Sequence, residues 1–386
     1  MPRALVISPE PPYPISGGGQ MRTASILHGL RRDFEIDLIT FQERGAPDPH
    51  AAMPGDLVHS MHVIGLPRHS RSTAARAVRN LRRLLQGVPP LVDRFRNASL
   101  DALLGNTRYD IGVVEHFWCA PYAEVLKPRC GRLILDLHNI ESTLLARSAE
   151  TQKGLGSLVL RRFSEISAAW ETRWLPHFDH VLVCSRADAS LLDRAAVVYP
   201  NSMPLVPQPD VPKLPVVAFS GNFDYEPNRA AILYFARRVW PELHARHPEL
   251  RWLLIGKNEQ WARAQLGDCP AVGFTGPVDD PIAQIAQATV AVVPLVSGSG
   301  TRFKIIEAWA AGTPVVSTSI GAEGLECNNG THLLVANSPQ ELLECVSQLW
   351  TSAELRAKLS MAGRALYRDR YTWPTVWESL DAILQP

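Results

Sequence analysis

The sequence predicts an α/β protein built from two doubly wound domains, and three observations support this. The chain has 386 residues, which is more than one hydrophobic core usually serves. Short apolar runs alternate with helical patterns, as is typical of parallel sheets covered by helices. A stretch with six prolines, residues 197–215, interrupts the alternation, which then resumes. We therefore expect an amino-terminal domain over 1–200, a linker over 201–215 and a second domain over 216–370.

The first domain opens with a βαβ unit. Residues 3–8 (RALVIS) predict a strand, residues 20–33 place apolar side chains at close to helical spacing, and residues 34–41 (FEIDLITF) predict the next strand. Further strands are expected at the apolar runs 59–66, 111–117, 132–139 and 180–185. Parallel strands end at one edge of their sheet, so we expect the functional loops to follow the strands.

The second domain repeats this pattern. Strands are expected at the apolar runs 216–222, 251–256, 272–276, 289–295, 313–318 and 332–336. Helices are expected over 228–246 and 302–312. Within residues 371–386, Trp373, Trp377, Leu380 and Leu384 fall on one helical face. We expect this last segment to be a helix that packs back on the first domain.

Composition excludes several classes of protein. The net charge of +1 argues against a protein that coats nucleic acid, so no nucleic-acid partner is expected. The six cysteines include no CxxC pair and no zinc-ligand spacing. No apolar run approaches ~18 residues, and the start lacks a secretion signal. We expect a cytoplasmic protein without a bound metal or organic cofactor.

One stretch carries most of the chemical information: PLVSGSGTRFKIIEAWAAGTPVVST, residues 294–318. Its small residues stand between a strand and a helix, where the absence of side chains lets a ligand approach backbone N–H groups at the positive end of the helix. Arg302 and Lys304 add cations suited to a diphosphate, and Glu307 suits a ribose diol. The alternative is a tight glycine turn with a Lys304–Glu307 surface pair.

These residues carry a resemblance to a known family. SGSGTRFKIIEAWAAGTPVVSTSIGAEGL resembles the donor-binding motif of family 4 glycosyltransferases, in particular the bacterial subgroup with a GSGTRxKxxE pattern. DLHNIES (136–142), GNFDYEPN (221–228), VGFTGPVDD (272–280) and RYTWPTVWESL (370–380) follow in the family's order, so the resemblance spans the chain. It implies the GT-B fold, in which two Rossmann-like domains face each other across a cleft.

The resemblance also implies an activity. Such enzymes move a sugar, with retention and without a metal, from a nucleotide-diphosphate donor to a hydroxyl acceptor. UDP- or GDP-sugars are favoured, and the acceptor belongs to polysaccharide, glycolipid or other glycoconjugate biosynthesis. Arg302 and Lys304 would bind the phosphates, and Glu307 the ribose. The implied donor-binding positions in this domain are Asn222, Lys257, Val278, Gly298, Ser299, Gly300 and Thr301.

Two departures from the family affect donor recognition. Many relatives have a glutamate where Ser299 stands, so the identity of the sugar does not carry over. Many also have an arginine after the glycine of the domain's first strand, where this chain has Asn222. Phosphate charge must then come mainly from Arg302 and Lys304, with Lys257 as a further candidate.

The first domain offers its own candidates. Gly18 and Gly19 lie in the first βα turn and are candidates to approach the donor phosphate, or else belong to a plain surface loop. Arg22 stands where the dinucleotide fingerprint needs glycine, so a nicotinamide cofactor is not expected. His138 ends a strand, and the resemblance implies a contact with the donor sugar, against the alternative of a structural core histidine. Asp136 alternates with it and points the same way.

Two pairs of neighbouring residues each allow two interpretations. Glu115 and His116 end another strand and are candidates for the acceptor side or for purely structural roles. Asp279 and Asp280 precede a proline, which favours a turn and a helix N-cap over a metal-binding pair.

Residues 67–91 form a basic segment without one acidic side chain. Its arginines are Arg68, Arg71, Arg76, Arg79, Arg82 and Arg83. Val78, Leu81, Leu84 and Leu85 are spaced to share a helix face. One interpretation is peripheral contact with an anionic membrane or lipid-linked acceptor through Arg68–Arg83, and the other is a solvated helix beside the acceptor site.

Rival functions share the predicted shape. A sugar-nucleotide epimerase would need additional acid/base groups that the sequence does not mark, and a phosphorylase would need a cofactor-anchoring lysine. A non-catalytic nucleotide-binding protein stays open because Ser299 replaces a glutamate common in relatives.

Overall fold

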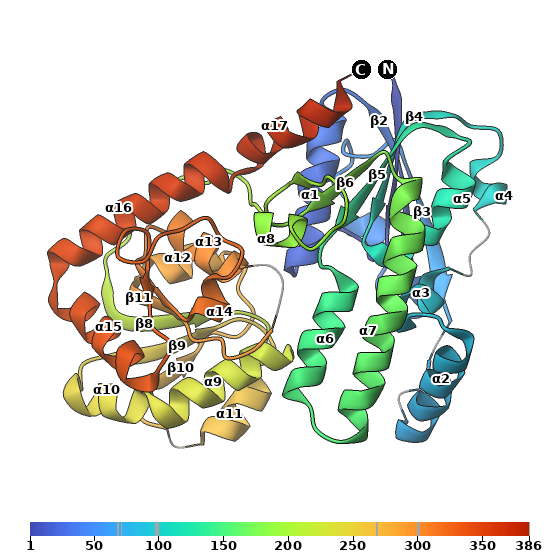
Figure 1. Cartoon of the computed structure of the whole chain (residues 1–386). Coiled ribbons are helices and arrows are strands. Elements are labelled where there is room, and N and C mark those ends of the chain that lie inside the picture. The colour runs from blue at the N-terminus through green and yellow to red at the C-terminus, as the bar shows by residue number, and fades with distance from the viewer. Residues whose placement is uncertain (68, 71, 97–99, 268, 299–301, 386) are drawn as a thin grey trace. The chain divides into compact units, whose positions relative to one another are not determined.

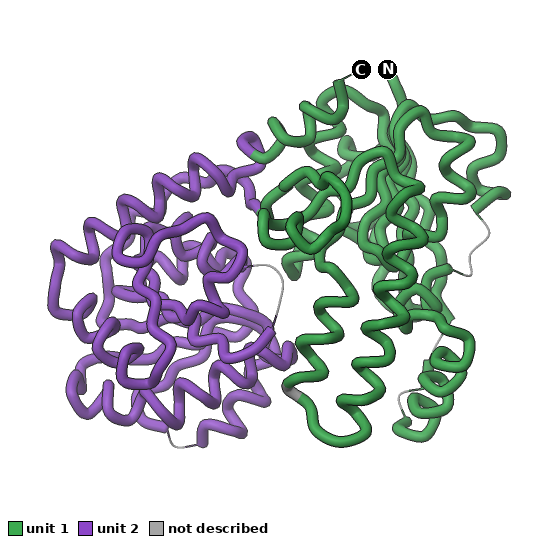
Figure 2. Tube along the Cα trace, viewed as in Figure 1, with its two compact units in different colours: residues 1–201, 376–386 green, residues 202–375 purple. Residues whose placement is uncertain are grey.

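The computed structural model describes residues 1–67, 69–70, 72–96, 100–267, 269–298 and 302–385. The chain forms two compact units, residues 1–201 with 376–386 (unit 1) and residues 202–375 (unit 2), coloured separately in Figure 2. Most of the predicted linker, residues 202–215, therefore falls within unit 2. Each unit is an α/β domain with its own sheet, so the predicted fold class of two doubly wound domains is confirmed.

Unit 1 is built on a parallel sheet of seven strands (Figure 1), in the order β3-β2-β1-β4-β5-β6-β7. The strands are β1 (Arg3–Ser8), β2 (Glu35–Glu43), β3 (Ser60–Leu66), β4 (Tyr109–Glu115), β5 (Cys130–Leu137), β6 (His180–Val183) and β7 (Val197–Val198). The helices are α1 (Gly18–Arg31), α2 (Thr73–Gln86), α3 (Pro90–Phe95), α4 (Asp101–Leu104), α5 (Ala123–Leu126), α6 (Glu141–Thr151), α7 (Leu155–Trp174) and α8 (Arg186–Ala189). The strand order reverses beside β1, so the loops after β1 and β4 lie at the switch point where ligands bind in such sheets.

Unit 2 has a parallel sheet of six strands in the order β10-β9-β8-β11-β12-β13. The strands are β8 (Leu214–Ser220), β9 (Arg251–Ile255), β10 (Val272–Phe274), β11 (Ala288–Val293), β12 (Val315–Ser317) and β13 (Leu334–Val335). The helices are α9 (Glu226–Arg238), α10 (Trp240–Arg246), α11 (Glu259–Leu266), α12 (Pro281–Ala286), α13 (Phe303–Ala310), α14 (Ser319–Ala322), α15 (Pro339–Thr351) and α16 (Ala353–Arg370). Helix α17 (Trp373–Leu384) begins in unit 2 and belongs to unit 1 from Val376 onward.

The sequence predictions of individual elements were largely right. Every run predicted as a strand overlaps an observed strand. The single helix predicted over 228–246 was wrong, because the chain forms α9 and α10 with a break at Val239. Pro241 lies in the first turn of α10, where its missing N–H is tolerated, whereas within one continuous helix it would remove a hydrogen bond. Asp280 accepts a hydrogen bond from the Ala283 N–H at 2.9 Å, which confirms the predicted N-cap.

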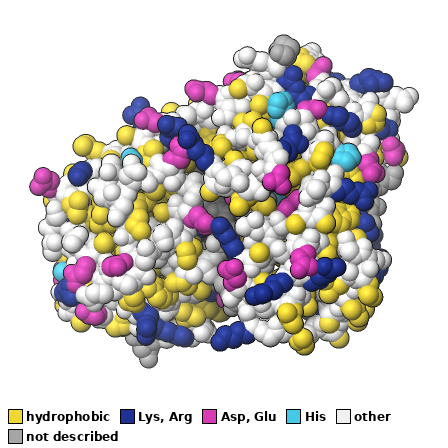
Figure 3. Space-filling model, in the orientation of Figure 1, with side chains coloured by type: hydrophobic (Ala, Val, Ile, Leu, Met, Phe, Trp, Pro, Cys, Tyr) yellow, Lys and Arg dark blue, Asp and Glu magenta, His cyan; other side chains and the backbone are white. Residues whose placement is uncertain are grey.

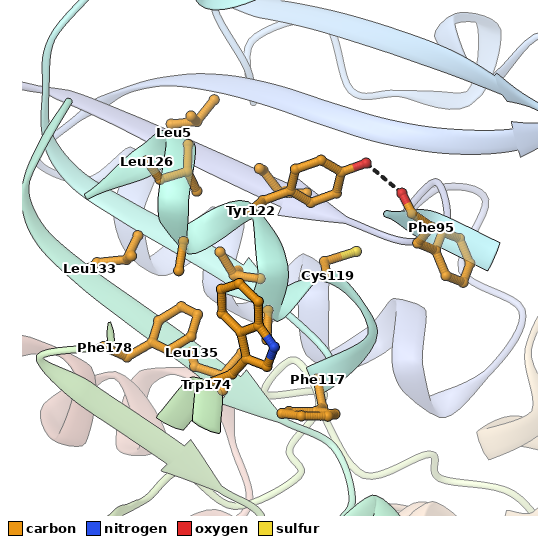
Figure 4. Close-up of a cluster of buried hydrophobic side chains, with 14 of the residues drawn as sticks. Leu5, Phe95, Phe117, Cys119, Tyr122, Leu126, Leu133, Leu135, Trp174 and Phe178 are labelled. Atoms are coloured by element: carbon orange, nitrogen blue, oxygen red, sulfur yellow. Dashed lines mark hydrogen bonds between the residues drawn. The ribbon is translucent and has the colours of Figure 1, made fainter. Parts of the chain in front are cut away.

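Two apolar layers cover the faces of the unit 1 sheet. One contains Phe117, Leu135 and Trp174 together with Tyr122, whose hydroxyl donates to the Phe95 carbonyl (Figure 4). The other joins β1, β2 and α1 to Val376, Leu380 and Ile383 of α17. Burial of these side chains supplies the main favourable free energy for holding strands and helices in register.

Helix α17 packs closely against α1 within unit 1. The Trp377 indole N–H donates to the Ser25 carbonyl at 2.9 Å, and its ring lies where a side chain on Gly29 would stand, at 2.9 Å. Trp373 and Leu380 are buried, as the apolar helical face predicted. A glycine at position 29 is therefore needed for the two helices to approach.

Candidate functional site

The start of α1 in unit 1 lies against two histidines. Its N-cap, Gly17, has extended backbone and no side-chain hydrogen bond, and its first turn carries no acid. A Cβ atom on Gly19 would stand 3.7 Å from His138 Nδ1, 3.8 Å from His116 Nε2 and 3.1 Å from Glu10 Oε1. Gly18 and Gly19 thus form a helix start whose backbone is close to both imidazoles.

His138 follows β5 and is held by two carboxylates. Its Nε2 lies 2.7 Å from Glu115 Oε2 and 3.2 Å from Asp136 Oδ2, and all three side chains are buried. Carboxylates accept hydrogen bonds, so Nε2 must carry a proton. The expectation that Asp136 and His138 point the same way is confirmed by this contact, and Glu115 joins them because β4 and β5 pair Glu115 with Asp136.

Arg22 completes this group, which we call the histidine cluster (Arg22, Glu115, Asp136 and His138). Its Nε and Nη2 donate to the two oxygens of Asp136 at 2.7 and 2.5 Å, and Nη1 donates to the Tyr199 carbonyl. Thr23 Oγ1 also donates to Glu115, whose Oε1 has no partner among the described groups. Two cations and two carboxylates thus share one buried site, where paired charges are favoured over isolated ones.

The pairing sets the protonation of the cluster. Burial opposes the charged form of His138, but hydrogen bonds and charge from Asp136 and Glu115 outweigh it and raise its pKa to about 8. Burial also opposes ionisation of Asp136, but Arg22 and His138 hold its pKa well below the ordinary value. Burial and the charge of Asp136 raise the pKa of Glu115 to about 6. His138 is therefore an imidazolium near neutral pH.

His116 sits in a strained position next to this cluster. Its backbone has a φ of 61°, which a non-glycine residue rarely adopts. Its ring stacks between Trp118 and His138, with centroids 4.1 and 3.6 Å away. Burial and the charge of His138 lower its pKa well below the ordinary value, so it is a neutral imidazole.

Two buried acids, Glu141 and Glu171, were missed from the sequence. Trp118 Nε1 donates to Glu141 at 2.8 Å, and Ser142 donates to Glu171 from its N–H and its hydroxyl. Burial raises the pKa of Glu141 to about 7, and burial likewise raises the pKa of Glu171. Glu141 opens α6 within the DLHNIES stretch (136–142), which was the available signal.

The chemistry of unit 2 gathers where β8 ends and α13 begins. Lys304 Nζ lies 5.3 Å from the centre of the Phe219 ring and would be 2.3 Å from a Cβ on Gly221, whose φ is 151°. Among the described residues, Lys304 has no hydrogen-bond acceptor and no carboxylate within ion-pair distance. Burial lowers its pKa to about 8, although Glu307 opposes this. Gly221 is therefore needed to seat an unpaired cation.

Glu307 shares the helix face of Lys304. Its Oε2 accepts a hydrogen bond from Ser220 Oγ at 3.1 Å, and burial raises its pKa. The predicted neighbourhood of Lys304 and Glu307 is thus present, but at a strand end within the unit rather than as an exposed surface pair. Oxygen lone pairs of Glu307 that Ser220 leaves free suit neighbouring hydroxyls.

Arg302 is arranged differently from the prediction for it. It is buried at the N-cap of α13, and its Nε and Nη2 donate to the carbonyl and the carboxylate of Glu323 at 3.0 and 2.9 Å. These bonds tie the start of α13 to the end of α14. The structure therefore gives Arg302 a supporting contact, whereas Lys304 is the unpaired cation.

The remaining predicted donor positions are spread over the strand ends. Asn222 Oδ1 accepts from the Asp224 N–H and from Asn258 Nδ2, so Asn222 shapes the β8–α9 loop. Lys257 follows β9, and Gly298 has a φ of 106° with Pro227 2.9 Å from its Cβ position. Val278 lies between β10 and α12. Ser299, Gly300 and Thr301 lie outside the described residues.

Glu115, Asp136 and His138 also satisfy the distances of a metal-ligand set, with ligand atoms within 4.8 Å of one another. Arg22 and the imidazolium already supply positive charge to both carboxylates. The donor set is thus used as an ion-paired cluster in this structure.

Sequence comparison relates unit 2 to a known family. Residues 214–352, which lie within unit 2, match the family described as "Glycosyl transferases group 1". The chain is 22% identical over 354 residues to an uncharacterized 44.6 kDa protein in the cps region of Klebsiella pneumoniae, covering 87% of this chain and 88% of that protein. It is 26% identical over 233 residues to a phosphatidyl-myo-inositol mannosyltransferase of Mycobacterium leprae, and this match covers 57% of this chain and 61% of that protein.

Solved structures show the same fold. Sucrose-phosphate synthase from Thermosynechococcus elongatus aligns with a TM-score of 0.69 at 18% identity over 99% of this chain and 98% of that chain. HepE of Anabaena, solved in complex with UDP, aligns with a TM-score of 0.66 at 15% identity, over 100% of this chain and 99% of that chain. The chain therefore has the GT-B fold, and its residues 214–352 form a glycosyltransferase domain of group 1.

Proposed function

We propose that this glycosyltransferase moves a sugar, with retention of configuration, from a nucleoside diphosphate sugar to a hydroxyl acceptor. UDP- or GDP-sugars are the favoured donors, and the acceptor belongs to polysaccharide, glycolipid or other glycoconjugate synthesis. Mannosyltransferase relatives and a neighbour bound to UDP support the donor class. Lys304 carries the proposal, because it is a part-buried cation beside a helix start without an anionic partner among the described residues.

Each unit 2 group then has a defined task. Lys304 and the N-terminus of α13 stabilise the charge that develops on the leaving diphosphate. Glu307 accepts hydrogen bonds from ribose hydroxyls, with Ser220 fixing its carboxylate. Arg302 holds the start of α13 in place through Glu323. No metal is required in this scheme, because lysine and helix dipole supply the positive charge.

In unit 1, His138 supplies a hydrogen-bond donor. Two carboxylates hold its Nε2 edge, so Nδ1–H is directed away from them, toward the start of α1. An imidazolium donates strongly to a sugar or phosphate oxygen. Glu115 acts through His138 and is a positioning residue, rather than the acceptor-contacting residue considered from the sequence, because its carboxylate is fully buried. His116 keeps the candidate acceptor role.

Retention follows from a same-face displacement. The bond from the anomeric carbon to the leaving phosphate oxygen breaks, and the bond to the acceptor oxygen forms. The acceptor hydroxyl gives its proton to the departing phosphate. Ser299, which stands where many relatives carry a glutamate, supplies no carboxylate for a covalent intermediate, so this single displacement is the simpler route.

The test is donor binding and turnover by the purified protein. Selective stabilisation in a thermal-shift screen of UDP-, GDP- and ADP-sugars would identify the donor class. Loss of that stabilisation is expected in Glu307→Ala, whereas Lys358→Met on the exposed face of α16 serves as a control. Donor hydrolysis or transfer would exclude a non-catalytic nucleotide-binding protein. Full activity in both Lys304→Met and Glu307→Ala would contradict the assignment.

A further inference from the structure

Helix α2 presents its apolar side chains to solvent. Val78, Leu81 and Leu85 are 68, 59 and 81% exposed, although their spacing places them in one stripe. The opposite face points inward: Arg83 is buried and its Nε binds Asp93 at 2.8 Å, and Arg79 is part-buried. The arginines of the segment are therefore not all on the exposed side of the helix. Arg68 and Arg71 lie outside the described residues.

Helix α17 also carries an apolar stripe, but its stripe is buried. There the apolar face is buried against α1, as Val376 and Leu380 show. The apolar stripe of α2 finds no such cover in unit 1. Exposed stripes of this kind on an ordered helix mark contact surfaces, since water exposure of large apolar side chains is otherwise avoided.

The helix is held firmly enough to present the stripe. Ser72 caps its start, Gly87 ends it in a left-handed conformation, and Trp170 of α7 donates to the Gly87 carbonyl at 2.7 Å. The outward placement of Val78, Leu81 and Leu85 is therefore built by contacts at both ends and by the inward ion pair of Arg83.

A second apolar projection extends from the same unit. Leu155 and Leu158, in the first turn of α7 next to the α6–α7 turn, are 81 and 62% exposed, and Lys153 in that turn is exposed too. In Figure 1, α2 and the α6–α7 turn extend in the same direction from the sheet of unit 1. Figure 3 shows apolar side chains exposed over this part of the molecule.

We propose that α2, with the α6–α7 turn, docks unit 1 on an anionic lipid bilayer. Charge favours a lipid surface: residues 72–92 contain four arginines and no acid, and the exposed Arg76 and Arg82 have no ion-pair partner among the described residues. Two separate aliphatic projections suit a broad fluid surface better than a peptide groove. Apolar insertion with flanking arginines is how interfacial helices bind acidic lipids.

This proposal goes beyond the proposed transfer reaction and does not depend on it. No helix in the described part of the chain is long and apolar enough to cross a membrane, so the contact would be peripheral. It would bring the enzyme to acceptors that are themselves carried on lipid.

Vesicle cosedimentation tests the docking directly, without substrate. The wild-type chain is expected to bind vesicles of equal parts phosphatidylcholine and phosphatidylglycerol, and not vesicles of phosphatidylcholine alone. Leu81→Ser with Leu85→Ser should weaken binding at least about tenfold. Arg76→Gln with Arg82→Gln should weaken it by about fivefold for each arginine, and added salt should do the same.

A matched control carries the same change elsewhere. Leu205→Ser with Met361→Ser alters two exposed apolar side chains of unit 2 and should leave binding unchanged. Three results would overturn the proposal: no vesicle binding by the wild type, equal binding by the Leu81/Leu85 variant, or equal binding to neutral vesicles. Dimerisation of the wild type that the same variant abolishes, without vesicle binding, would assign the stripe to a second copy of the chain instead. Each outcome is separate from donor turnover.

Discussion

The two units hold their buried charges in different ways. In unit 1, Arg22, Asp136, His138 and Glu115 are linked by contacts of 2.5–3.2 Å, so every charge has a partner from the chain itself. In unit 2, Lys304 and Glu307 share a helix face, but the lysine lies beside Gly221 and the Phe219 ring and has no ion-pair partner among the described residues. The charges of unit 1 are neutralised within the folded domain, whereas Lys304 of unit 2 would be neutralised by a bound anion. Removing a charge from the cluster in unit 1 should therefore mainly lower the stability of the fold. Removing a charge in unit 2 should mainly weaken donor binding and turnover.

The largest expected effect is on the stability of unit 1. Asp136→Asn leaves the buried Arg22 guanidinium without its carboxylate, which should lower the free energy of unfolding by about 3–5 kcal/mol. Urea denaturation followed by far-UV circular dichroism measures this loss. Combining the change with Arg22→Met should recover part of it, since both charges are then absent. A loss under about 1 kcal/mol would mean that the pair does not behave as a buried ion pair.

In unit 2, Lys304→Met should reduce turnover strongly without lowering stability. Turnover of the preferred donor should fall about 10²- to 10³-fold, because the charge on the leaving diphosphate loses its main cation. The midpoint of thermal unfolding should stay the same or rise, since an unpaired cation is replaced by an apolar side chain. Steady-state kinetics and a thermal melt on one preparation separate the two effects. Destabilisation with unchanged turnover would reverse the roles assigned to the two units.

The third effect is the pH dependence of stability. The pKa of His138 rises from about 6.5 unfolded to about 8 folded, so its contribution is fully present below pH 6.5 and disappears as pH rises through 8. The free energy of unfolding should fall by about 2 kcal/mol across this window. Denaturation at a series of pH values measures the slope. His138→Gln should flatten it, and an unchanged slope in that variant would assign it to other groups.

The smallest expected effect concerns Glu323. Its carboxylate pairs with Arg302 but is 38% exposed, so Glu323→Gln should cost under about 1 kcal/mol of stability. Turnover should fall only modestly, since Arg302 keeps its bond to the Glu323 carbonyl. Kinetics of this variant beside Lys304→Met show how much turnover depends on the Glu323 carboxylate. A loss as large as that of Lys304→Met would mean that the bond to the Glu323 carbonyl alone does not hold Arg302 and the start of α13 in place.

Much of this arrangement was predictable from the sequence. The strands and their loops follow from apolar runs, and the shared direction of Asp136 and His138 follows from the two-residue period of a strand. The burial of α17 follows from the spacing of its tryptophans and leucines. These features depend on residues that are close together in sequence, where a period fixes which side chains share a face.

Other features depend on distant segments, and the sequence did not show them. Arg22 appeared only as a residue that breaks a glycine fingerprint, although it pairs with Asp136 across 114 positions. Glu115 meets His138 because two strands align in register, which no local pattern specifies. The orientation of α2 is likewise set by Asp93 and Trp170 rather than by its own amphipathic pattern.

The position of α17 has a consequence for how the chain is made. Residues 376–386 belong to unit 1, and Val376, Leu380 and Ile383 lie in its core, whereas the 174 residues before them form unit 2. During synthesis, unit 1 must wait with an uncovered apolar surface on α1 until all of unit 2 has left the ribosome. Chain growth at about 5–20 residues per second makes that interval several seconds or more. The protein therefore completes its first domain last.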